Sequence, residues 1–147
     1  MAEQLNYEVA CLQTRSRQVS LNDEVQRDAD VRANLERIFQ MIDYVTAFGN
    51  SEVRLIVTPE YAINARWHKM ELADWMKICT TVPGPYTDLI GEKAKQRNVF
   101  IAANLLEVHP DFPGRFFNCS VLIGPDGKVL IKHWKSNTKA SVFPYTT

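Results

Sequence analysis

The sequence has few cysteines, and their placement does not suggest a disulfide framework. Cys11, Cys79 and Cys119 are odd in number, widely spaced and surrounded by apolar residues. Small secreted domains that depend on disulfides usually carry an even number of cysteines at characteristic spacings. We therefore expect reduced thiols and a cytoplasmic protein.

The sequence also lacks an excess of charge of either sign and any long hydrophobic run. Seventeen basic and seventeen acidic residues give a formal net charge of zero over 147 residues. Neither nucleic acid nor a membrane is therefore expected as a partner. No apolar stretch approaches the roughly 20 residues of a membrane-spanning helix, and the acidic N-terminus differs from a secretory signal. A small, roughly neutral molecule is the expected partner.

Motifs for metal and nucleotide binding are missing as well. The histidines His68, His109 and His133 do not stand at metal-ligand spacing with one another or with the cysteines, so we expect neither a metal nor another cofactor. The first apolar run leads into Gln13 without a glycine-rich turn for phosphate, which disfavours a nucleotide-binding domain.

What the chain does contain is an alternation of strand and helix patterns. Short apolar runs predict strands at residues 7–13, 53–57, 99–106, 119–123 and 128–134. Apolar periodicity and composition predict helices at residues 31–47 and 86–97, and partly over 64–81. Asp28 or Asp30 is the expected cap of the first helix and Gly49-Asn50 its stop. The Gly-Pro-Asp-Gly turn at 124–127 predicts an antiparallel hairpin. This order indicates an α/β fold with a mixed sheet, in a chain long enough for one domain.

Two charged residues follow predicted strands and form a candidate acid/base pair. Pro59 has no amide hydrogen to give a sheet ladder, so Glu60 is expected just beyond the carboxyl end of the strand at 53–57. Lys135 follows the last strand of the hairpin. Ligands of open α/β sheets bind beyond the carboxyl ends of the strands. Whether Lys135 reaches the same edge as Glu60 depends on strand direction, which the sequence leaves open.

Five short segments extend this pair into a wider pattern. They are Thr-Pro-Glu-Tyr at 58–61, Val-Pro-Gly-Pro at 82–85, Phe-Asn at 117–118, Gly-Pro-Asp-Gly at 124–127 and His-Trp-Lys at 133–135. In this order and spacing they resemble the carbon-nitrogen hydrolases of the nitrilase superfamily. The resemblance implies a four-layer α-β-β-α sandwich, in which this chain supplies a mixed sheet with helices on one face. It also implies a homo-oligomer without cofactors.

The resemblance further implies a Glu-Lys-Cys triad that cleaves small amides, nitriles or N-carbamoyl compounds. Glu60 maps onto its general base, and Lys135 onto the residue that stabilises the tetrahedral intermediate. Tyr61 and Trp67 are weaker candidates for substrate binding, and Asn118 is expected to serve the backbone. Burial in a dry pocket would raise the pKa of Glu60. Attraction to Lys135, about 4 kcal/mol at about 4 Å and an effective dielectric near 20, would lower it. The sequence does not decide between these two effects.

The sequence departs from the family pattern in two respects. Trp134 replaces the basic residue common before the lysine, and the family's nucleophilic cysteine lies beyond the point where this chain stops. Cys79 and Cys119 are expected to be buried hydrophobes rather than nucleophiles. We therefore interpret residues 1–147 as a partial carbon-nitrogen hydrolase domain, the N-terminal portion of the enzyme, with an open apolar sheet face. The alternative is a non-catalytic truncated product that acts only through self-association or pairing with a full-length relative.

Overall fold

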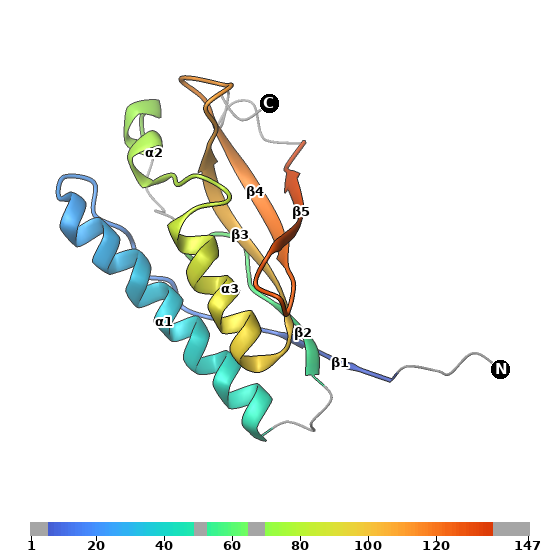
Figure 1. Cartoon of the computed structure of the whole chain (residues 1–147). Helices are drawn as coiled ribbons and strands as arrows, with labels where there is room; N and C mark the ends of the chain where they lie inside the picture. Colours follow the sequence, from blue (N-terminus) through green and yellow to red (C-terminus); the bar gives the residue numbers. More distant parts are fainter. Residues whose placement is uncertain (1–5, 49–52, 65–69, 137–147) are drawn as a thin grey trace.

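The computed structural model describes residues 6–48, 53–64 and 70–136 (Figure 1). Within these ranges strands and helices alternate as the sequence predicts. The elements in chain order are β1 (Glu8–Cys11), α1 (Glu24–Phe48), β2 (Val53–Val57), α2 (Leu72–Ile78), α3 (Pro85–Arg97), β3 (Phe100–Val108), β4 (Phe116–Ile123) and β5 (Val129–Trp134).

The strands form one mixed sheet in the order β1-β2-β3-β4-β5. The first three strands are parallel, and β3, β4 and β5 follow one another antiparallel. The predicted hairpin of β4 and β5 is confirmed. Two reversals of direction after β3 make β5 run the same way as β2 and β3. The carboxyl ends of β2 and β5 therefore lie at the same edge of the sheet.

One face of the sheet is covered by α1 and α3, which lie side by side in Figure 1. The helices bury Leu35, Ile38 and Ile42 from α1 and Ile90 from α3 in the core. Their apolar partners in the sheet include Ile56, Ile101, Val121 and Ile123, each at most 3% exposed. The prediction of an α/β fold whose mixed sheet has helices on one face is confirmed.

The first helix begins earlier than its apolar periodicity predicts. It starts at Glu24, and Asp23 caps it by accepting a hydrogen bond from the Gln26 amide at 3.0 Å. The prediction of Asp28 or Asp30 as the cap is therefore wrong. Asp30 is instead buried inside the helix, where its carboxylate accepts a hydrogen bond from the Ser20 amide at 3.1 Å. This bond holds the polar segment before α1 against the helix. The periodicity of apolar residues does not predict such a contact. The predicted stop at Gly49-Asn50 lies outside the described residues.

The strands β3 and β4 are longer than the apolar runs suggest. They pair continuously from Ile101 opposite Ile123 to Val108 opposite Phe116. The apolar runs alone predict that the third strand ends at residue 106 and that the fourth begins at Cys119, because the prolines at 110 and 113 indicate a loop. Pairing across the sheet carries both strands nearly to that loop.

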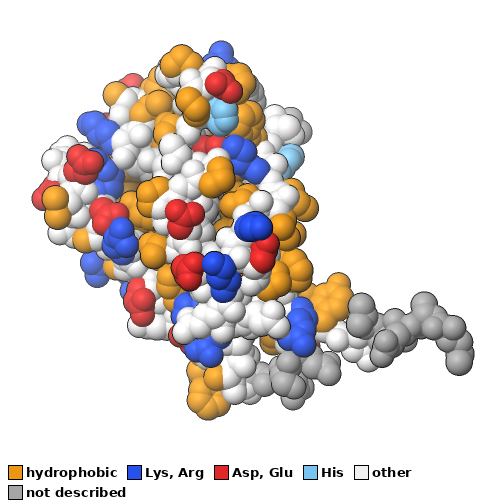
Figure 2. All heavy atoms as spheres, viewed as in Figure 1, with side chains coloured by type: hydrophobic (Ala, Val, Ile, Leu, Met, Phe, Trp, Pro, Cys, Tyr) orange, Lys and Arg blue, Asp and Glu red, His pale blue; other side chains and the backbone are white. Residues whose placement is uncertain are grey.

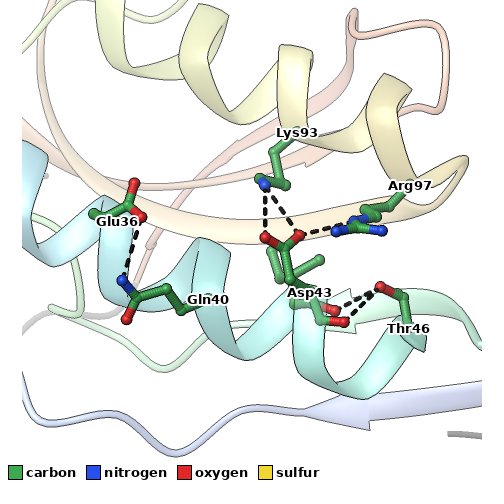
Figure 3. Close-up of polar contacts among 7 residues, drawn as sticks. Glu36, Gln40, Asp43, Thr46, Lys93 and Arg97 are labelled. Carbon is green, nitrogen blue, oxygen red and sulfur yellow. Dashed lines mark hydrogen bonds and ion pairs between the residues drawn. The ribbon is translucent and has the colours of Figure 1, made fainter. Parts of the chain in front are cut away.

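An ion cluster joins α1 to α3 on the outer side of the helices (Figure 3). Asp43 of α1 accepts hydrogen bonds from Lys93 Nζ at 3.0 and 3.2 Å and from Arg97 Nε at 2.8 Å. Burial alone raises the pKa of Asp43, but these two cations hold it below its usual value. Figure 2 shows acidic and basic side chains interspersed over this side of the molecule. None of the described helices is both long enough and apolar enough to cross a membrane.

The hairpin turn lies directly against α3 at a glycine-to-glycine contact. Gly127, with a φ of 82°, closes the turn by donating its amide to the Gly124 carbonyl at 2.8 Å. A methyl group added at Gly91 of α3 would stand 2.4 Å from the Gly127 carbonyl oxygen. Since backbone is on the other side, the contact cannot relax by rotating a side chain.

We predict that Gly91→Ala destabilises the protein. Alanine normally favours a helix interior by about 1 kcal/mol over glycine, but the clash with Gly127 outweighs this gain and separates the hairpin from α3. The measurement is the free energy of unfolding in urea. Gln96→Ala, at an exposed position of the same helix, is the control and should be neutral or slightly stabilising. A stabilised Gly91→Ala variant would contradict the packing described here.

The second face of the sheet, opposite α1 and α3, carries exposed apolar side chains. Val9 is 47% exposed, Phe100 36% and Ile131 58%. We call this the open face. It also carries the polar residues of the site described next.

Candidate active site

Glu60 stands just past the carboxyl end of β2, as predicted. The ladder between β2 and β3 makes one further bond, from the Thr58 amide to the Ala102 carbonyl at 2.9 Å. Pro59 follows and has no amide to continue the ladder. The next residue, Tyr61, has a φ of 61°, which is unusual for a bulky residue. The chain therefore turns sharply at Glu60, at the mouth of the sheet.

Lys135 reaches the same edge from β5. Its amide donates to the Asn118 carbonyl at 2.9 Å, which fixes the backbone directly after the strand. Its Nζ donates to Glu60 Oε1 at 2.8 Å. The structure therefore brings the two residues together, and the strand direction that the sequence left open places them at one edge.

Two buried asparagines form a chain of hydrogen bonds that ends on the Glu60 carboxylate. Asn118 Nδ2 donates to Glu60 Oε1 at 2.6 Å and to the Tyr61 hydroxyl at 3.3 Å. Asn104 Nδ2 in turn donates to Asn118 Oδ1 at 2.6 Å, and Asn104 Oδ1 accepts the Tyr61 amide at 3.1 Å. The two asparagines are 5% and 7% exposed. Asn118 thus fixes the carboxylate of Glu60 by its side chain, and the expectation that it serves the backbone is wrong.

A signal for the asparagine pair was present in the sequence. Asn104 interrupts the apolar run of β3, and Asn118 interrupts that of β4. A buried amide needs hydrogen-bond partners, so two such residues in neighbouring strands indicate a polar network. Of the weaker candidates, Tyr61 is partly buried beside Glu60, whereas Trp67 lies outside the described residues.

Two opposing effects act on the pKa of Glu60, and the structure shows which one is larger. Partial burial raises the pKa of Glu60, but hydrogen bonds from Lys135 and Asn118 and the lysine charge together hold it below its usual value. The hydrogen bond to Glu60 raises the pKa of Lys135. Burial and the charge of Glu60 raise the pKa of Tyr61. Glu60 is therefore ionised and Lys135 protonated at neutral pH.

The pair lies at the rim of a hollow of about 320 Å³ on the open face. Its polar lining comes from Thr58, Glu60, Asn104, Asn118, Ser120, His133 and Lys135. Strands β2 to β5 each contribute, directly or through the residues that follow them. The hollow is large enough for a small molecule next to both charged groups.

The three cysteines do not line this hollow. Burial raises the pKa of Cys79, whose thiol donates to the Trp75 carbonyl at 3.1 Å. Burial and then Glu107 raise the pKa of Cys119. Cys11 is exposed in β1. Among the described residues, no group of three or more His, Cys, Asp or Glu side chains is placed to hold a metal ion.

The fold and the site define an α/β protein with a mixed sheet and a Glu-Lys pair at its carboxyl edge. Comparison with known proteins shows its family. The carbon-nitrogen hydrolase family profile matches residues 8–144. The chain belongs to this family. It is 33% identical over 125 residues to a formamidase of Bacillus cereus (strain B4264) and 32% identical to one of Bacillus thuringiensis (strain Al Hakam). Each match covers 82% of this chain and 35% of the relative.

Solved structures show the same fold. An N-terminal amidase superposes with a TM-score of 0.71 at 16% identity, over 89% of this chain and 28% of that one. A nitrilase-superfamily member from Saccharomyces cerevisiae gives 0.65 at 18% identity, over 80% and 42%. The chain therefore has the nitrilase-type fold. It spans about a third of the length of the curated relatives that it matches.

We predict that Lys135→Met raises the pKa of Glu60. The substitution removes a hydrogen bond and a positive charge, whereas the burial that raises the pKa remains. The measurement is a pH titration of the Glu60 carboxyl carbon by NMR. Lys128→Met, in the hairpin turn beside Asp126, is the control and should leave the Glu60 pKa unchanged. An unchanged pKa in Lys135→Met would show that the pair does not form in solution.

Proposed function

We propose that this chain supplies the Glu60 and Lys135 part of an enzyme that hydrolyses non-peptide carbon-nitrogen bonds in small amides, nitriles or N-carbamoyl compounds. The observation that carries the proposal is the 2.8 Å contact between Lys135 Nζ and Glu60 Oε1 at the rim of the hollow. Membership of the carbon-nitrogen hydrolase family supports it. The formamidase names of the relatives make a short amide the first substrate to test.

In the proposed reaction Glu60 acts as a general base. Ionised at neutral pH, it accepts the proton of a cysteine thiol as the sulfur attacks the amide carbon. Lys135 stabilises the negative charge that develops on the amide oxygen. Glu60 then gives the proton to the leaving amine as the carbon-nitrogen bond breaks. A water molecule, deprotonated by Glu60, cleaves the thioester, which releases the acid and restores the thiol.

Asn118 and Asn104 keep the base in position during these proton transfers. Because Asn118 and Lys135 both donate to Oε1, the carboxylate is held in one orientation. Oriented groups contribute to rate because the reacting atoms do not have to search for their geometry. We assign Glu60 and Lys135 catalytic roles and Asn118 a positioning role.

In this proposal the nucleophile is a cysteine other than Cys11, Cys79 and Cys119. The raised pKa values of Cys79 and Cys119 oppose formation of a thiolate, and neither residue lines the hollow beside Glu60. Residues 1–147 then correspond to the N-terminal portion of the hydrolase domain. The second sheet and the nucleophile come from residues beyond it.

We predict that Glu60 and Lys135 work in place of their counterparts in a formamidase. The segment of the Bacillus cereus enzyme that corresponds to residues 8–144, the range of the family match, is exchanged for those residues of this chain, and formamide hydrolysis is followed by ammonia release. Glu60→Gln should lower the rate of an active chimera by about 10²–10⁴-fold, the usual contribution of a general base, and Lys135→Met should also lower it. Lys128→Met is the matched control.

The isolated chain serves as the reference without a nucleophile. Loss of a nucleophile costs about 10⁶-fold in rate, so residues 1–147 alone should give no measurable ammonia. Turnover by the isolated chain that disappears in Cys79→Ala or Cys119→Ala would contradict the placement of the nucleophile. A folded, active chimera that is indifferent to Glu60→Gln would contradict the role of Glu60.

A second candidate function is favoured by the open face. In this alternative the chain is non-catalytic and acts through self-association or by pairing with a full-length relative. Soluble monomers seldom expose contiguous apolar patches larger than a few hundred Å². The exposed side chains of Val9, Phe100 and Ile131 on the open face are suited to covering by another sheet, as in sheet-on-sheet packing.

We predict that the isolated chain self-associates through the open face. Ile131→Lys, which places a charge on that face, should shift the sedimentation profile toward the monomer. Val25→Lys changes an apolar residue that is 82% exposed at the start of α1, on the helix side, and should leave the profile unchanged. A compact monomer at high concentration that binds no hydrophobic dye would mean that the open face is covered within the chain.

A further inference from the structure

A buried carboxylate that the proposed reaction does not use lies on the opposite side of the sheet from Glu60. Glu107, near the end of β3, is 0% exposed. Its Oε1 accepts a hydrogen bond from Lys132 Nζ at 2.7 Å, and its Oε2 accepts one from Trp134 Nε1 at 2.5 Å. Both donors belong to β5, the strand directly before Lys135.

This contact ties two strands that are not neighbours in the sheet. Strand β4 lies between β3 and β5 and contributes Phe117, whose ring stacks on Trp134 with centroids 4.1 Å apart. Lys132 Nζ also donates to the Val82 carbonyl at 3.1 Å, which joins the segment before α3 to the same cluster. A buried charge is costly unless it is paired and hydrogen-bonded. Glu107 therefore favours the one position of β5 that brings both donors to it.

The position of β5 decides where Lys135 points. Side chains alternate along a strand, so Lys132 and Trp134 face the helix side while His133 and Lys135 face the hollow. A slip of one residue would exchange the two sets. Strand β5 is the edge strand of the sheet, with mostly exposed residues and a register shift opposite Leu122. Few apolar contacts therefore fix its register.

We propose that Glu107 is a positioning residue that sets the register of β5 and thereby brings the Lys135 ammonium to Glu60. The proposal rests on the function proposed above for Glu60 and Lys135. A slip of one residue would turn Lys135 toward the helix side and Lys132 toward the face of the hollow. The pairing of Lys132 with Glu107 opposes that slip. The indole of Trp134 donates to the second oxygen of Glu107 and favours the same register of β5.

The test is the Glu60 titration by NMR in three variants of the full chain. Glu107→Gln keeps the shape of the side chain and removes its charge. Trp134→Phe removes the indole donor and keeps an aromatic ring, and it serves as the second probe if Glu107→Gln does not fold. Asp43→Asn removes a paired carboxylate of the helix layer and controls for general loss of stability.

If the proposal is correct, Glu107→Gln and Trp134→Phe raise the Glu60 pKa in the same direction as Lys135→Met. Asp43→Asn should leave it at the wild-type value, even where unfolding shows a comparable loss of stability. A purely structural Glu107 would lower stability without moving the Glu60 pKa, and that result would overturn the proposal.

The outcomes separate this proposal from the function on which it rests. If Lys135→Met itself leaves the Glu60 pKa unchanged, the Glu60 and Lys135 pair is wrong and the proposed function fails with it. If Lys135→Met raises the Glu60 pKa but neither Glu107→Gln nor Trp134→Phe does, only the positioning role of Glu107 is overturned. The readout needs no substrate and no nucleophile.

Discussion

The candidate site depends on the direction of β5 relative to β2. Glu60 and Lys135 are 75 residues apart in the chain, yet their side chains meet at 2.8 Å. They meet because the antiparallel steps from β3 to β4 and from β4 to β5 restore the direction of β2. The hairpin turn that makes the second reversal packs against α3 through Gly91 and Gly127. The helix layer and the site are therefore linked through one tight turn.

The two faces of the sheet use polar residues in different ways. On the open face Asn104 and Asn118 form a chain of hydrogen bonds that ends on Glu60. On the helix face the Glu107 carboxylate accepts hydrogen bonds from Lys132 and Trp134. Buried polar groups of this kind must be satisfied to be tolerated. Once satisfied, they fix the strands more specifically than apolar contacts of similar size do.

The charge state of the site results from competition between burial and pairing. Burial alone favours a neutral Glu60, but hydrogen bonds from Lys135 and Asn118 and the lysine charge outweigh it. A base must be ionised before it can accept a proton, so a lowered pKa keeps Glu60 ready over a wide pH range at the expense of basicity. Lys135 remains protonated because its hydrogen bond to Glu60 raises its pKa. Each group of the pair thus keeps the other in the form that the proposed chemistry requires.

Local sequence patterns predict the order of strands and helices, the hairpin, and the position of Glu60 and Lys135 just after predicted strands. These features depend on local patterns: apolar runs, helical spacing, a proline that ends a ladder and a turn with fixed residue types. The folded structure is needed to show that Lys135 reaches the same edge as Glu60, that Asp23 rather than Asp28 or Asp30 caps α1, and that Asn118 binds the Glu60 carboxylate. It also shows that Glu107 of β3 binds Lys132 and Trp134 of β5. These contacts join residues far apart in the chain, and they follow from strand direction and burial, which local periodicity does not encode.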